Sequence, residues 1–150
     1  MQDIYINPFT DFGFKKLFGE EPRKNILIAF LNTLLPARHQ IQALTYDKTE
    51  QVGASLDDRQ ARFDLACISS TGERFIIEIQ KATQNYFKDR SVYYSTFPIQ
   101  AQAKQGDWDF KLNAVYSIGI LNFVFDEDQR AHDQTVVHTV QLKDQNNALF

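Results

Sequence analysis

Two carboxylates stand inside apolar stretches of the sequence. Asp64 lies within the run FDLACI, and Glu78 lies within the run FIIEI. Burying an unpaired carboxylate costs several kcal/mol, so each acid needs a compensating partner. For Asp64 there are two alternatives. The partner is structural if it is a hydrogen bond from a neighbouring loop or an ion pair with Arg62 or Arg74. The partner is functional if it is a bound cation. Glu78 carries the same two alternatives.

The two acids are predicted to face each other across a β-hairpin. Residues 62–68 and 74–80 have the composition of strands, and Ser69–Gly72 has the composition of a turn. If paired residue numbers sum to about 141 to 142, Asp64 lies opposite position 77 or 78. The two carboxylates can therefore share one face of the hairpin.

Two neighbouring carboxylates repel each other unless one is protonated or a cation bridges them. Oxygen ligands favour Mg²⁺ or Mn²⁺, so the pair is a candidate metal site. Gln80 lies two residues after Glu78 and points to the same side of a strand, because the side-chain period is two. Its amide could orient a water molecule or a phosphate oxygen, or it could be an ordinary exposed strand residue.

Positive charge follows this hairpin on a predicted helix over residues 83–104, as a phosphate backbone would require. The basic residues near it, set against the single acid Asp89, are Lys81, Lys88, Arg90 and Lys104. An ion pair with a neighbouring acid is the structural alternative for Arg90, and a solvated side chain is that for Lys81. Tyr and Phe recur at three- and four-residue steps over 86–97, a spacing that indicates core packing rather than base stacking.

The remaining pattern predicts an α/β or α+β fold, a central sheet flanked by helices. Gly13 weakens the helical pattern of residues 9–18, whereas 23–35 has clear helical spacing that Pro36 ends. Pro98 should kink or split the helix over 83–104. Further strands are expected within 41–50, at 113–125 covered on both faces, and at 135–142, with a connection at 53–58.

Composition narrows the class of protein. The chain has 150 residues, 43% of them hydrophobic, and fits one folded domain over 1–150. No apolar run is long enough for a transmembrane helix, and the start lacks the pattern of a signal peptide. The single cysteine, Cys67, fits a reducing compartment and is expected to be a small buried hydrophobe. We therefore expect a cytoplasmic protein with no membrane partner.

The three histidines, His39, His132 and His138, are not spaced as metal ligands are. We therefore assign them no role.

Several separated motifs, in this order, resemble the PD-(D/E)XK nuclease family transposases, also called recombination-promoting nucleases or putative transposases. They are DFGFKKLF, LNTLL, FDLAC, ERFIIEIQKA, YFKDRSVYYST and GDWDF, and together they cover essentially the whole chain. The resemblance implies a restriction-endonuclease-like core with a mixed sheet. It also implies hydrolysis of phosphodiester bonds in DNA with Mg²⁺ or Mn²⁺ as the cofactor.

The resemblance also assigns roles by position. Asp64 and Glu78 would be metal ligands, and Gln80 would occupy the place of the superfamily's catalytic lysine. Gln cannot carry a positive charge or act as a base. In this family Gln is usual at the lysine position. The attacking water would then be activated by Lys81 or be a metal-bound hydroxide.

The N-terminal motif adds two positions. Asp11 and Lys15 match it, and Asp11 would add a third acidic metal ligand. Lys15 and Arg90 are the positions expected to bind the substrate. Family members are usually longer than 150 residues, so a truncated C-terminus is expected.

Two functions follow as hypotheses. The first is a metal-dependent DNA endonuclease related to mobile elements and recombination. A double-strand cut by subunits with one site each would further suggest a homodimer. The second is a catalytically inactive nuclease-fold module that binds DNA or protein. Convergence of Asp64, Glu78 and Gln80 around room for a cation would favour the first.

Overall fold

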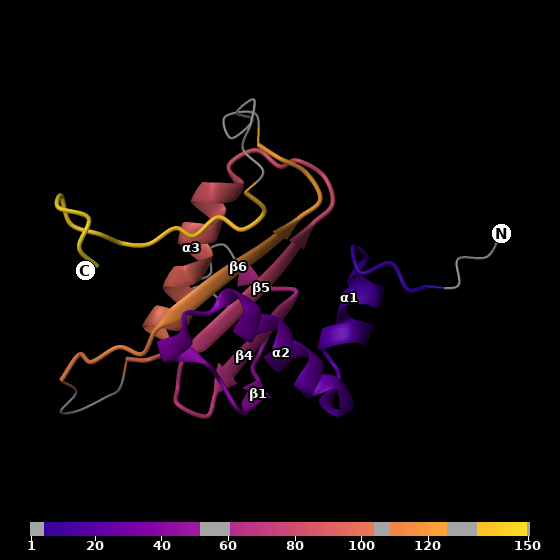
Figure 1. Cartoon of the computed structure of the whole chain (residues 1–150), viewed down its shortest axis with the longest axis horizontal. Helices are drawn as coiled ribbons and strands as arrows, with labels where there is room; N and C mark the ends of the chain where they lie inside the picture. Colours follow the sequence, from indigo (N-terminus) through magenta and orange to yellow (C-terminus); the bar gives the residue numbers. More distant parts are fainter. Residues whose placement is uncertain (1–4, 52–60, 104–108, 126–134, 150) are drawn as a thin grey trace.

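A mixed four-stranded sheet lies at the centre of the protein, with helices on both faces (Figure 1). The computed structural model describes residues 5–51, 61–103, 109–125 and 135–149. The strands, in spatial order, are β1 (Leu44–Tyr46), β4 (Leu65–Ser69), β5 (Arg74–Gln80) and β6 (Val115–Leu121). β4 is antiparallel to β1 and β5, whereas β6 is parallel to β5. The predicted fold class, an α/β mixed sheet flanked by helices, is confirmed.

Two N-terminal helices cover one face of the sheet, α1 (Asp11–Phe18) and α2 (Lys24–Leu34). Leu27 and Leu31 of α2 are fully buried, as their four-residue spacing on one helix face predicts. They pack with Phe75 and Ile77, two of the odd-numbered apolar residues of β5. A short 3-10 helix at Glu21–Arg23, with Pro22 in its first turn, joins α1 to α2.

Helix α1 forms across Gly13, which helix propensity disfavours. The Thr10 hydroxyl caps the helix by accepting a 3.0 Å hydrogen bond from the Gly13 N–H. A Cβ at position 13 would lie 1.9 Å from the backbone oxygen of Asn7. The close approach of these two backbone segments therefore requires glycine.

The opposite face of the sheet is covered by α3 (Phe87–Gln100). Tyr94 and Phe97 pack against Phe63 and Ile76, so this part of the aromatic stripe is core, as predicted. The helix is not split at Pro98, contrary to expectation, and continues to Gln100. Pro98 is buried in the last turn, where little helix remains to be disrupted.

The strand predicted over 62–68 is interrupted. β3 (Ala61–Arg62) pairs with β2 (Glu50–Gln51) in a separate two-stranded ribbon, and β4 starts only at Leu65. The predicted strand within 41–50 is likewise divided between β1 and β2. Asp64 thus lies in a bend between two strands, not inside one.

Two C-terminal predictions need correction. β6 is shorter than predicted and is an edge of the sheet within the described residues; Ser117 and Gly119 are exposed, so its α3 face is only partly covered. Residues 135–142 are exposed and form no strand, although Lys143 and Leu149 form an isolated antiparallel bridge just beyond them. The connection predicted at 53–58 and Lys104 lie outside the described residues.

A side chain closes the connection between α3 and β6. The buried Gln102 amide donates to the backbone oxygen of Asn113 at 3.2 Å and accepts from its N–H at 2.8 Å. These two hydrogen bonds resemble those between paired strands and fix where the chain re-enters the sheet.

Across the described ranges, no helix has the length and apolar character needed to cross a membrane.

Candidate active site

The hairpin of β4 and β5 sets Asp64 opposite Glu78. Its last registered pair is Leu65 with Ile77, whose numbers sum to 142, and this confirms the predicted hairpin register. One step further along the ladder, position 64 meets position 78. Ile76 packs in the cluster beneath α3, so the even-numbered side chains of β5 face that helix.

Asp64 is compensated by the backbone of the neighbouring strand. Its Oδ2 accepts a 2.7 Å hydrogen bond from the N–H of Ile79. The structural alternative of an ion pair with Arg62 or Arg74 is wrong, because Arg62 pairs with Glu50 and Arg74 pairs with Asp47. The carboxylate thus extends the hairpin ladder by one hydrogen bond and is held against β5.

Glu78 is the most deeply buried carboxylate described, with 8% of its surface exposed. Oε2 accepts a 3.4 Å hydrogen bond from Nη2 of Arg90, and buried Oε1 has no hydrogen-bond partner among the described residues. Burial, followed by the charge of Asp64, raises the pKa of Glu78 to about 7. The Arg90 charge and the Asp64 backbone N–H oppose this rise.

Arg90 is held in place from several sides. Its guanidinium lies 5.3 Å from the ring centroid of Phe87 and 5.6 Å from that of Tyr94. It also donates a hydrogen bond to Gln84 Oε1. The ion pair with a neighbouring acid, the structural alternative for Arg90, is confirmed, and that acid is Glu78. Arg90 is therefore part of the carboxylate site.

The start of α3 can lie close to Glu78 because β6 provides a glycine there. Gly119 is the registered partner of Glu78 on β6. A Cβ at this position would lie 2.7 Å from Cζ of Phe87. The sequence reasoning missed both Gly119 and Gln84; the one available signal was a glycine within an otherwise apolar strand.

Gln80 and Lys81 lie at the end of β5. Gln80 is half-buried, its even position puts its side chain on the Glu78 face, and its backbone oxygen accepts a 3.0 Å hydrogen bond from Asn122. Lys81 is exposed just beyond the strand, in agreement with its structural alternative of a solvated side chain.

The N-terminal candidates are not brought into this group. Asp11 and Lys15 form a 2.7 Å ion pair along α1, and both side chains are more than half exposed. Helix α1 packs on the other face of the sheet through Phe14. No three His, Cys, Asp or Glu side chains of the described ranges gather as a metal site. Within these ranges, Asp11 therefore does not join Asp64 and Glu78.

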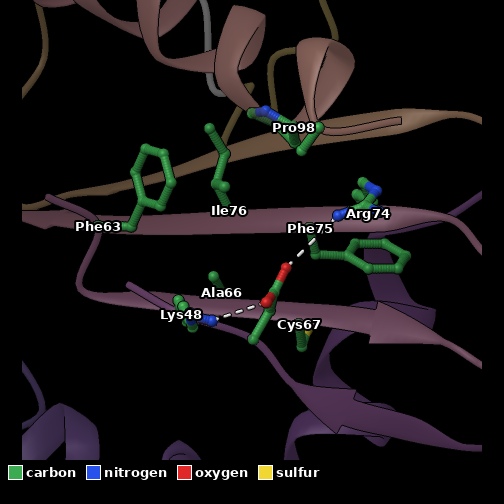
Figure 2. Close-up of a pocket in the computed structure, with 10 residues that line it drawn as sticks. Lys48, Phe63, Ala66, Cys67, Arg74, Phe75, Ile76 and Pro98 are labelled. Carbon is green, nitrogen blue, oxygen red and sulfur yellow. Dashed lines mark hydrogen bonds and ion pairs between the residues drawn. The ribbon is translucent and has the colours of Figure 1, made fainter. Parts of the chain in front are cut away.

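A separate pocket lies further along the sheet, near the C-terminal end of α3. Figure 2 shows Phe63, Ile76 and Pro98 around it, and Asp47 also lines it. Asp47 accepts hydrogen bonds from the Lys48 N–H at 2.8 Å and from Arg74 at 3.5 Å. Asp64 and Glu78 do not line this pocket.

The carboxylate pair fits a hard divalent cation. The donors are carboxylate oxygens, and Oε1 of Glu78 is a buried acceptor without a partner. A cation between the two acids would also remove the repulsion that raises the Glu78 pKa. Mg²⁺ usually takes one or two carboxylates and completes its shell with water and substrate phosphate, so two acids are sufficient.

Comparison with protein-family models gives a match over most of the chain. The model of the PD-(D/E)XK nuclease family transposases matches residues 8–149, which include every element of the fold and all the candidate site residues. The searches of curated proteins and of solved structures gave no significant match. A match that spans nearly the whole chain establishes membership. The chain belongs to the PD-(D/E)XK nuclease family transposases.

Proposed function

We propose that this protein is a metal-dependent endonuclease that hydrolyses phosphodiester bonds in DNA. The observation that carries the proposal is the unpartnered, buried Oε1 of Glu78 beside the Asp64 carboxylate. A buried acceptor without a donor is rare in folded proteins and calls for an explanation. A Mg²⁺ or Mn²⁺ ion would supply the missing partner, and membership of a nuclease-related family agrees with this reading.

Each residue of the site has a role in this proposal. Asp64 and Glu78 would hold the ion, which when bound polarises the scissile phosphate and lowers the pKa of water. Asp64 is orientated by the Ile79 N–H, so its second oxygen has a defined direction. The Gln80 amide can hold the attacking water by hydrogen bonds but cannot remove its proton. Arg90 and Lys81 can bind the phosphate backbone.

Calorimetric titration with Mn²⁺ tests the metal site. Wild type should bind the ion, Asp64→Asn and Glu78→Gln should each lose at least ten-fold in affinity, and Asp89→Asn should bind as wild type. Asp89 is a matched control because it is an exposed acid next to Arg90. Mn²⁺ binding that is unchanged in both site variants would overturn the assignment.

Cleavage of a DNA plasmid in Mg²⁺ tests the activity. The same two site variants should reduce cleavage by at least a hundred-fold, while Asp89→Asn should cleave normally. Linear product formed before nicked product accumulates would support paired subunits, as in the proposed homodimer. A role in recombination at mobile elements, and the cytoplasmic location that access to DNA suggests, belong to the same proposal.

The second candidate is an inactive nuclease-fold module. The observation in its favour is that one oxygen of each acid already has a protein partner, Ile79 for Asp64 and Arg90 for Glu78. If this is the function, wild type binds DNA equally with and without divalent ions, and the two site variants bind as wild type does.

A further inference from the structure

One aromatic residue departs from the core-packing pattern of its neighbours. Tyr86 precedes α3 and is 79% exposed, whereas Phe87 beside it is buried against Gly119. Among the described residues, no ring contact or side-chain hydrogen bond is made by Tyr86. Solitary exposed aromatics are common, so this exposure alone assigns no role.

The backbone of Tyr86 adds a second observation. Its φ of 60° and ψ of 29° lie in the left-handed region, which a bulky residue rarely adopts. Phe87, the next residue, is buried, whereas Tyr86 in this conformation is exposed. Backbone strain of this kind is commonly associated with functional positions.

The location of Tyr86 connects it with the carboxylate pair. The Arg90 N–H donates a 2.9 Å hydrogen bond to the Tyr86 backbone oxygen. The guanidinium of the same arginine contacts Glu78 at 3.4 Å. Tyr86 thus lies one helical turn before the residue whose side chain touches the proposed metal ligand.

The charge around Tyr86 suits a nucleic-acid strand. Residues 80–90 contain Lys81, Lys88 and Arg90 against one acid, Asp89, although the whole chain carries a net charge of −3. Both lysines are exposed. Lysines that attract phosphates beside an exposed aromatic ring are the usual combination for binding single-stranded nucleic acid, where bases stack on aromatic side chains.

We infer that Tyr86 stacks on an unpaired nucleobase next to the scissile phosphate, which makes single-stranded or locally unpaired DNA the preferred substrate class. The inference rests on the proposed nuclease function and adds the form of DNA that it takes. In a duplex both faces of each base are covered by neighbouring bases, so Tyr86 would have no base face to contact. An unpaired base beside the cleavage position leaves its face free for the ring.

The test measures binding of a short single-stranded oligonucleotide that contains 2-aminopurine, and of its duplex form, with Ca²⁺ in place of Mg²⁺. Tyr86→Gly should weaken single-strand binding about ten-fold and abolish the stacking-induced fluorescence quenching. Duplex binding should change less than two-fold. Tyr86→Phe should retain both binding and quenching. Glycine suits a positive φ, so Tyr86→Gly removes the ring without imposing backbone strain.

Phe110 offers a matched control, because it has a φ of 59° and is 76% exposed. Phe110→Gly should leave both signals unchanged. Wild-type affinity and quenching in Tyr86→Gly, equal losses on single strand and duplex, or a wild type that binds no oligonucleotide would each overturn the inference. A separate Mg²⁺ cleavage assay distinguishes the two proposals: cleavage without a Tyr86 effect refutes only stacking, and Tyr86-dependent stacking without cleavage refutes only the nuclease.

Discussion

The N–H of Ile79 donates a 2.7 Å hydrogen bond to the carboxylate of Asp64, fifteen residues earlier in the chain. This bond continues the β4–β5 ladder past its last registered pair and holds Asp64 opposite Glu78. Asp64 is therefore not an ordinary strand residue, because a backbone N–H of the neighbouring strand holds its side chain.

Glu78 should make the metal-free protein less stable as the pH rises. Its pKa is 4.5 before folding and about 7 in the fold, so the folded state holds the extra proton between these values. The free energy of unfolding should therefore fall from pH 4.5 to pH 7, relative to Glu78→Gln, by roughly 3 kcal/mol at most. Urea unfolding across this range, in a chelator, measures the difference. Glu50→Gln, which removes an exposed acid, should parallel wild type; parallel curves for Glu78→Gln as well would contradict the assignment.

Metal binding should release a proton from Glu78. Because the folded pKa is about 7, Mn²⁺ should displace about one proton per ion at pH 6 and close to none at pH 8. Calorimetric titration in buffers of different ionisation enthalpy measures this number. Equal proton release at both pH values would show that Glu78 is not the titrating ligand.

Removing Arg90 should raise the pKa of Glu78 further. The guanidinium is the first of the two influences that lower this pKa, so Arg90→Gln leaves burial and the Asp64 charge less opposed. A ¹³C NMR titration of the Glu78 carboxyl group detects the change. Lys88→Gln removes a cation from the same helix and should have a smaller effect. A fall in the Glu78 pKa in Arg90→Gln would be the wrong sign for this ion pair.

Gly13→Ala should destabilise the protein, although alanine is normally the better helix residue by about 1 kcal/mol. The new Cβ would lie 1.9 Å from the Asn7 backbone oxygen, so the chain before α1 must move. We expect a loss of about 2 kcal/mol in the free energy of unfolding, as for overpacking in a core. Chemical denaturation measures it; a gain in stability would show that the N-terminal segment adjusts freely.

Gly119→Ala should displace the start of α3. Its Cβ would lie 2.7 Å from the Phe87 ring, and a loss of about 1 to 2 kcal/mol in unfolding free energy is expected. Phe87→Leu in the same chain shortens the obstructing side chain and should recover part of that loss. If the double variant is no more stable than the sum of the two single effects predicts, the two positions are not coupled.

The hairpin and the facing acids could be predicted from sequence because their determinants are local. A short Gly-containing turn between two apolar runs sets the register, and the register sets which side chains oppose each other. The bend at Asp64 was not predicted, because strand propensity does not show that a carboxylate will take a backbone donor from the next strand. The sequence also does not show with which acid Arg90 forms its ion pair, because that depends on how closely α3 approaches the sheet.

Other errors arise where the neighbours of a residue decide the outcome. Gly13 is unfavourable in a helix by propensity, but contact with Asn7 demands it. The alternation in residues 135–142 favours a strand, yet a strand also needs an adjacent strand, and these residues pair with none in the described part of the chain. Sequence patterns therefore identify candidate helices and strands, whereas strand pairing and close contacts between backbone segments decide which of them form.

The double hydrogen bond between Gln102 and Asn113 has a consequence for how the protein could be engineered. One side-chain amide bonds both backbone groups of Asn113, so a residue just after α3 holds the entry into β6 directly. Insertions between these two positions should leave the sheet and the carboxylate pair intact. The connection is therefore a position at which an engineered tag or a fused domain can be tested.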